Sequence, residues 1–202
     1  MKKRVLILGA HPDDPEIGCM GYMLKNKESI IFDIVVACGN EDRKKEMDKA
    51  MNGLIKNNID IGAYECLGFQ DGIFSEFKKE FKKYLANLRT RNNYDLILTH
   101  YREDMHQDHR GVSESTLETF RSEQIMSYEI PKYDGCSFRP SYYVRLEKNI
   151  IEGKVAHLTE NYESQQIKKW YVDDLFYSWA KIRGLECNSD WAEAYCPVKL
   201  FN

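Results

Sequence analysis

Two stretches of this chain gather side chains that can bind a metal ion and transfer protons. The first, Gly9–Gly18, contains His11, Asp13 and Asp14. The second, His106–Arg110, contains two histidines and an aspartate. Four of the five histidines of the chain lie in or just before these stretches. A single histidine is usually structural, whereas this concentration of imidazoles among carboxylates favours a metal site.

The adjacent carboxylates of Asp13 and Asp14 point to a cation. In a crevice they would repel one another, and one would take up a proton unless a cation lay beside them. One carboxylate can bind a divalent ion while its neighbour faces the water that the ion activates. Two imidazoles, one carboxylate and an open position form the ligand set of catalytic zinc, and Fe²⁺ or Mn²⁺ also accept such donors. Capping of the next helix would explain one aspartate at most, and not His11.

The second stretch offers two imidazoles on one helical turn. His106 and His109 lie at i and i+3, which places them on the same face of a helix. One of them can bind the ion while the other acts as an acid or faces an oxyanion. His100 stands at the end of a predicted strand, where it could orient a neighbour without binding the ion. Asp108 and Arg110 have the alternative of an ordinary solvated helix start.

Strands and helices must bring these two stretches together. Nearly continuous apolar runs predict buried strands at 4–9, 30–37, 63–67 and 94–99. Amphipathic patterns predict helices between and after them, at 16–26, 41–56, 75–90 and 107–121. This alternation predicts a three-layer, Rossmann-like α/β fold with a mostly parallel sheet flanked by helices. Ligands of such sheets bind at the carboxyl ends of the strands, where both stretches fall.

The remainder of the chain is less regular. The region 126–147 contains two short β-like pieces joined by a turn at Asp134-Gly135. We predict a helix at 162–183 and an irregular tail at 184–202. Without a linker, repeat or low-complexity segment, residues 1–202 are predicted to form one domain.

Composition narrows the functional classes. The formal net charge is −3, which gives no electrostatic footprint for nucleic acid or an anionic membrane. No apolar run approaches the ~20 residues of a membrane span, and a cytoplasmic location is expected. The six cysteines include no Cys-x-x-Cys pair, so we expect reduced thiols. The sequence leaves open whether identical chains form a homo-oligomer.

The chain lacks the motifs of several other enzyme classes. The turn after the first strand has no Gly-x-Gly-x-x-Gly, and its carboxylates would repel a pyrophosphate. No Gly-x-Ser-x-Gly elbow of a serine hydrolase is present. Two alternatives remain beside a metal-dependent amide hydrolase. One is a metallophosphoesterase, which commonly needs two metals and more bridging carboxylates. The other is a non-catalytic carbohydrate-binding protein.

The two motifs together resemble the PIG-L (LmbE-like) family of zinc-dependent de-N-acetylases. His11-Pro12-Asp13-Asp14 matches the motif that these proteins carry after their first strand. His106-Gln107-Asp108-His109 matches their later His-x-Asp-His motif. The resemblance extends over nearly the whole chain. It implies hydrolysis of an N-acetyl group on an amino sugar, a sugar nucleotide or a glycoconjugate.

The resemblance also implies a role for each matching residue. Metal ligands would be His11, Asp14 and His109. Asp13 would be the general base. His106 would stabilise the oxyanion or protonate the departing amine, and Asp108 would orient an imidazole. Arg43 and Asp71 are looser matches to substrate-binding positions.

One position departs from the family pattern. Some members carry Tyr or Arg just before the His-x-Asp-His motif, where this chain has Asp104 and Met105.

Overall fold

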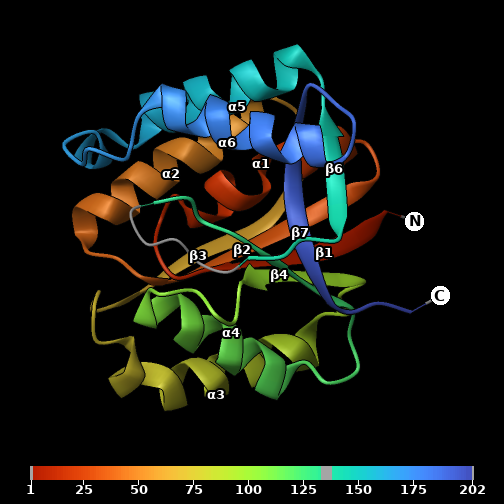
Figure 1. The fold of residues 1–202 in the computed structure, drawn as a ribbon. Coiled ribbons are helices and arrows are strands. Elements are labelled where there is room, and N and C mark those ends of the chain that lie inside the picture. The colour runs from red at the N-terminus through yellow and green to blue at the C-terminus, as the bar shows by residue number, and fades with distance from the viewer. Residues whose placement is uncertain (1, 133–137, 202) are drawn as a thin grey trace.

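The computed structural model describes residues 2–132 and 138–201. Its core is one seven-stranded sheet in the order β3-β2-β1-β4-β5-β7-β6 (Figure 1). The strands β3, β2, β1, β4 and β5 are parallel, and β7 runs antiparallel to both of its neighbours. The strand bounds are β1 (Lys3–Gly9), β2 (Ile30–Cys38), β3 (Ile61–Phe69), β4 (Leu96–His100), β5 (Ile125–Tyr128), β6 (Tyr142–Leu146) and β7 (Trp191–Lys199).

Helices cover both faces of this sheet (Figure 1). One face carries α1 (Asp14–Asn26), α2 (Glu41–Lys56), α5 (Lys148–Asn161) and α6 (Asp173–Glu186). The other face carries α3 (Lys78–Arg91) and α4 (Gln107–Thr119), and two short 3-10 helices are η1 (Phe74–Phe77) and η2 (Glu163–Gln165). The predicted three-layer α/β fold with a mostly parallel sheet is confirmed.

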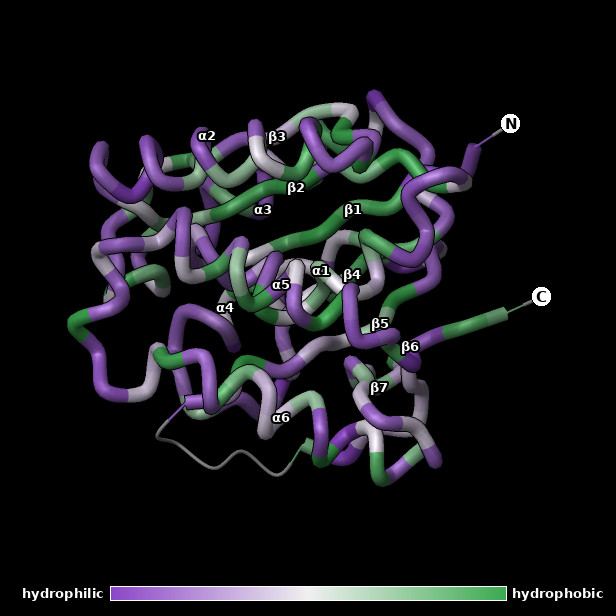
Figure 2. Tube along the Cα trace, turned by 90° about the horizontal axis from the view of Figure 1, so that it is seen from above, coloured by the Kyte–Doolittle hydropathy of each residue, from purple (hydrophilic) through white to green (hydrophobic). Residues whose placement is uncertain are grey.

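The first strand shows why the apolar runs are continuous. Val5 and Ile7 belong to the core on the α1 face, whereas Leu6 and Leu8 belong to the core on the α4 face. Because successive side chains of a strand point to opposite faces, a strand buried on both sides must be apolar throughout. Figure 2 shows the hydrophobic colouring running along β1 and β2 in the middle of the molecule.

The predicted helix at 162–183 is wrong in its first half. The structure has α5 at 148–161 instead, followed by η2 and turns, and α6 begins only at Asp173. The spacing of Ile151, Val155 and Leu158, all buried, is the helical signal for α5. Asp173 and Asp174 give α6 an acidic first turn, which the helix dipole favours.

The predicted irregular tail at 184–202 is also wrong, because Trp191–Lys199 forms β7. This strand lies between β5 and β6, so the two β-like pieces of 126–147 are strands but not neighbours. The apolar pattern of β7 is interrupted by Glu193, whose charged side chain is buried. Its carboxylate accepts the Gly21 and Tyr22 backbone N–H groups at 2.6 and 2.7 Å and pairs with Lys154 Nζ at 2.7 Å.

Two further expectations concern the cysteines and the turn at Asp134-Gly135. The five cysteines in the described part of the chain are free, as expected for reduced thiols. Cys136 and the predicted turn lie outside the described residues.

Candidate metal centre

His11, Asp14 and His109 meet at the carboxyl edge of the sheet. His11 follows β1, Asp14 begins α1, and His109 lies in the first turn of α4. His11 Nδ1 lies 3.3 Å from Asp14 Oδ2, and His109 Nε2 lies 3.6 Å from the same oxygen. Tetrahedral zinc with bonds of about 2.0–2.1 Å separates its ligand atoms by roughly 3.3 Å. The three donors therefore fit a single divalent cation.

Carboxylates fix the far side of both imidazoles. Asp104 Oδ2 lies 2.9 Å from His109 Nδ1, and both side chains are buried. His11 Nε2 lies 3.0 Å from Asp71 Oδ1 and 3.3 Å from Asp108 Oδ2. Metal-binding histidines commonly donate their second N–H to a carboxylate, which sets the tautomer and makes the other nitrogen a better donor to the metal.

Asp104 is testable as the group that orients His109. It also accepts the His106 backbone N–H on Oδ1 at 2.7 Å. We expect Asp104→Asn to weaken metal affinity about 10–100-fold, because an amide has one acceptor oxygen where the carboxylate has two. Titration of the metal-free protein with Zn²⁺ measures the effect, and the exposed Asp190→Asn is the control. Unchanged affinity in Asp104→Asn would remove it from this role.

Asp108 anchors the loop that carries Asp71. Its Oδ2 accepts the Gly72 N–H at 2.7 Å, and its Oδ1 accepts the Phe74 N–H at 3.2 Å. The same carboxylate faces His11, as the predicted orienting role requires. Asp108 therefore links the loop after β3 to the start of α4.

The hydrogen bond that His106 accepts sets which of its ring nitrogens can donate. Its Nδ1 accepts the Asp108 backbone N–H at 3.2 Å and so caps α4. When Nδ1 is an acceptor, the neutral ring carries its proton on Nε2. Burial, followed by the charge of Lys132, lowers the pKa of His106 and favours this neutral form.

Asp13 is held in a strained backbone conformation beside the three ligands. Its φ of 116° lies in a region that residues other than glycine rarely adopt, at a cost of about 1–3 kcal/mol. Arg43 donates from Nη2 to Asp13 Oδ1 at 2.6 Å and also to the Pro12 carbonyl. Burial raises the pKa of Asp13 to about 7, against the opposing charge of Arg43. A nearby divalent cation would lower that pKa.

Arg43 faces Asp13 as well as the open cleft. Glu46 accepts its Nη1 at 2.6 Å, Ser164 Oγ lies at 3.2 Å, and the guanidinium carbon lies 5.3 Å from the centre of the Tyr162 ring. Arg43, the predicted sugar contact, therefore forms an ion pair with Asp13, the predicted base. Asp71, the other predicted substrate contact, lies in the cleft with its carboxylate on His11, and the hydrogen bond from His11 lowers the pKa of Asp71.

His100 lies behind the three ligands. Its Nε2 accepts the Ala10 N–H at 2.8 Å, and its ring stacks on His109 with centroids 4.0 Å apart. Within the described chain, its buried Nδ1 has no hydrogen-bond partner. His100 Nε2, the nitrogen that lies 3.2 Å from Asp14 Oδ2, already accepts the Ala10 N–H. We therefore do not count His100 among the candidate ligands, and its ring packs behind them.

Comparison with known proteins decides the family. The model of the PIG-L family, described as GlcNAc-PI de-N-acetylase, matches residues 6–120, more than half of the chain and both motifs. The chain belongs to the PIG-L family. The uncharacterized deacetylase YaiS of Escherichia coli is a relative, 27% identical over 176 residues that cover 79% of this chain and 91% of YaiS.

Solved structures share the fold. The conserved protein TT1542 from Thermus thermophilus has a TM-score of 0.75 at 22% identity, covering 98% of this chain and 96% of its own. An N,N′-diacetylchitobiose deacetylase from Pyrococcus horikoshii has a TM-score of 0.68 at 17% identity, covering 97% of this chain and 84% of its own. Each shares its fold with nearly the whole of this chain.

A cleft of about 680 Å³ leads to the candidate metal centre of this PIG-L protein. The loops after β1, β2 and β3 and the segment at 164–168 line it. It meets a smaller compartment of about 60 Å³ at His11, Asp71, Gln165 and Lys168, and this compartment also contains Asp13, Asp14, His106, Lys132 and Trp170. The cleft therefore has room for a molecule larger than an acetyl group.

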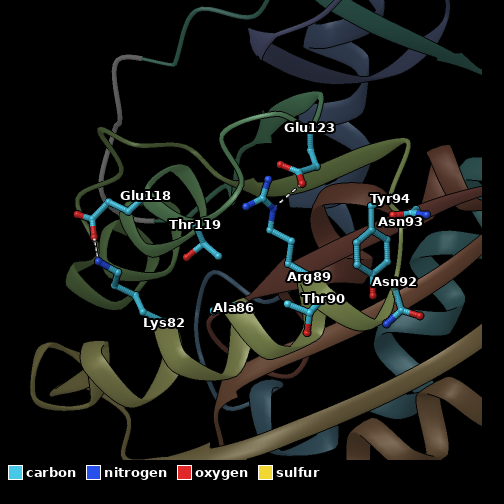
Figure 3. A pocket seen from close by; sticks show the side chains of 10 residues that line it. All are labelled: Lys82, Ala86, Arg89, Thr90, Asn92, Asn93, Tyr94, Glu118, Thr119 and Glu123. Carbon is cyan, nitrogen blue, oxygen red and sulfur yellow. Dashed lines mark hydrogen bonds and ion pairs between the residues drawn. The ribbon is translucent and has the colours of Figure 1, made fainter.

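A second hollow lies at the opposite edge of the sheet. It measures about 630 Å³, between α3 and α4 (Figure 3). Its charged groups pair with each other, Lys82 with Glu118 at 2.5 Å and Arg89 with Glu123 at 2.6 Å. Tyr94, which precedes β4, marks the amino ends of the strands. This hollow is therefore separate from the candidate metal centre, which lies at the carboxyl ends of the strands.

Two polar side chains that the sequence predictions did not assign also lie at the site. Lys132 lies just beyond β5, and its Nζ is 3.5 Å from His109 Nε2. Glu46 fixes Arg43. A prediction that β5 belongs to the parallel part of the sheet would have identified Lys132 as a candidate, because residues after that strand reach the same edge.

In the described part of the chain, no helix combines the length and hydrophobicity that a bilayer crossing requires.

Proposed function

We propose that this chain is a metal-dependent hydrolase that removes the acetyl group from an N-acetylated amino sugar or its conjugate. The observation that carries the proposal is the grouping of His11, Asp14 and His109 within reach of one cation, with Asp13 and His106 beside it. Membership of the PIG-L family supports the same chemistry. The single sheet that runs from β1 to β7 supports one catalytic domain over residues 1–202.

The cation would supply two effects when bound. It would polarise the acetyl carbonyl and make water acidic enough to attack near neutral pH. Two imidazoles and a carboxylate suit Zn²⁺ best, and they accept Fe²⁺ or Mn²⁺ as well. We propose Zn²⁺ as the native ion.

The side chains of the chain would move the protons. Asp13 takes a proton from the attacking water while the new bond to the carbonyl carbon forms. Arg43 keeps the Asp13 carboxylate pointing toward the compartment. As the carbon–nitrogen bond breaks, the departing nitrogen takes up the proton that Asp13 holds, and His106 donates a hydrogen bond from Nε2 to the tetrahedral intermediate. The products are acetate and a free amine.

The cleft supports a substrate with more than one sugar-sized part. The similar Pyrococcus enzyme is named for a disaccharide, N,N′-diacetylchitobiose. Asp71 lies where the cleft meets the compartment and Arg43 lines the cleft, so their outer atoms are proposed to bind sugar hydroxyls. A free glycoside, a sugar nucleotide or a glycoconjugate would each fit this description.

Acetate release tests the proposal. We would incubate the zinc-loaded protein with N-acetylglucosamine, N,N′-diacetylchitobiose, UDP-N-acetylglucosamine and N-acetylglucosamine 1-phosphate. At least one should release acetate, and a chelator should abolish the release. A phosphomonoester assay with Mn²⁺ runs in parallel. Phosphate release without acetate release would replace this function with that of a metallophosphoesterase, and sugar binding without turnover would indicate a non-catalytic relative.

A further inference from the structure

Lys132 has no assigned role and lies against the metal centre. Its Nζ is 3.5 Å from His109 Nε2, the nitrogen that faces Asp14. It lines the same compartment as Asp13, Asp14 and His106. Among the described residues, no carboxylate lies within ion-pair distance of its ammonium group. A cationic hydrogen-bond donor therefore lines the compartment in which the acetyl group is proposed to react.

The backbone before Lys132 is held firmly. Tyr128 in β5 accepts the Tyr101 backbone N–H at 3.0 Å. Glu129 forms two hydrogen bonds with Arg183, both of 2.7 Å, and both side chains are buried. Pro131 is buried as well. These contacts fix the direction in which the chain leaves β5 and so bring Lys132 to the carboxyl edge of the sheet.

Three side chains next to His106, those of Asp104, Met105 and Arg110, do not line the compartment. The Asp104 carboxylate turns inward to His109 and to the His106 N–H. Met105 is 62% exposed and apolar. Arg110 turns back to donate to the carbonyls of Asp104 and Met105 at 2.8 and 2.6 Å. None of these three side chains donates into the compartment, whereas Lys132 reaches it from the segment after β5.

We propose that Lys132 is a further catalytic residue whose ammonium group stabilises the oxyanion that forms on the acetyl carbonyl. This inference rests on the proposed function. When water attacks the carbonyl carbon, the π electron pair moves to oxygen, and Asp13 takes the proton of the water. The pair returns when the carbon–nitrogen bond breaks, and the departing nitrogen takes up the proton that Asp13 holds. Lys132 keeps its protons throughout and acts by charge and hydrogen bonding.

The test compares Lys132→Gln, Lys132→Arg and wild type on the N-acetyl sugar that wild type turns over best. Loss of one oxyanion donor costs about 10²–10³-fold in kcat. We expect that loss for Lys132→Gln, a KM within about threefold of wild type, and full metal content. Lys132→Arg should recover part of the rate because it keeps the charge. The exposed Lys45→Gln, which makes the same charge change on α2, should match wild type.

A second measurement separates catalysis from folding. A methylphosphonamide of glucosamine carries an anionic tetrahedral oxygen and mimics the intermediate. Lys132→Gln should bind it more weakly, by about the factor lost in kcat/KM, while glucosamine binds with unchanged affinity. Three results for Lys132→Gln would each overturn the assignment: a kcat equal to that of wild type, loss of the bound metal, or an effect limited to a raised KM for N-acetylglucosamine 1-phosphate. If wild type releases no acetate from any sugar, the proposed function itself fails, whereas an active Lys132→Gln defeats only this inference.

Discussion

Asp13→Asn is expected to lower kcat for acetate release by about 10²–10⁴-fold while the protein keeps its full metal content. An amide accepts the hydrogen bond from Arg43 but cannot take a proton from the attacking water. Because Asp13 is not among the three proposed ligands, the cation should stay. Steady-state kinetics and elemental analysis of the same sample measure the two effects, with Asp190→Asn as the control. Undiminished turnover would exclude Asp13 as the base, and loss of metal would make it a ligand.

The same variant should change the stability of the metal-free protein. Asp13 has a pKa of about 7 in the fold, against about 3.9 in an unfolded chain. A raised pKa means that the protonated form favours folding, so this contribution is complete below pH ~4 and is lost as pH rises toward ~7. In chelator, wild type should lose thermal stability relative to Asp13→Asn between pH 5 and pH 8. Parallel melting curves across that range would contradict the raised pKa.

His109→Ala is expected to abolish stoichiometric metal binding. It removes one of three donors and leaves Asp104 buried without its imidazole partner. Removing the orienting group alone costs about 10–100-fold in affinity, so removal of the ligand itself should cost more. Activity at micromolar Zn²⁺ should disappear with the metal.

His106→Ala is the matched control for that experiment. It lies on the same turn of α4 and makes the same chemical change, but its Nδ1 caps the helix and does not face Asp14. It should keep the metal and lose turnover. Elemental analysis after dialysis and circular dichroism of both variants distinguish ligand loss from unfolding. Equal metal content in the two variants would sink the assignment of His109, and metal loss in both would make His106 a ligand.

The sequence by itself determined the parallel part of the fold and the chemistry of its edge. A strand buried on both faces must be apolar throughout, so β1, β2 and β4 are visible as uninterrupted runs. The carboxyl ends of parallel strands meet at one edge, which brings His11 and His109 together without knowledge of any side-chain contact. Motif composition then indicates a cation, since adjacent carboxylates need one.

Only the tertiary structure decided the antiparallel end and the partners of the site. The sequence pattern does not indicate β7, because a charged residue, Glu193, stands within it. Glu193 can be buried only because Lys154 and backbone N–H groups of α1 pair with its carboxylate, and these partners are far from it in the chain. The pairing of Asp104 with His109, of Arg43 with Asp13, and of Lys132 with the metal centre likewise depends on side-chain direction across different elements. Residue types and spacing carry no such direction, because it is set by packing between segments that meet only when the chain has folded.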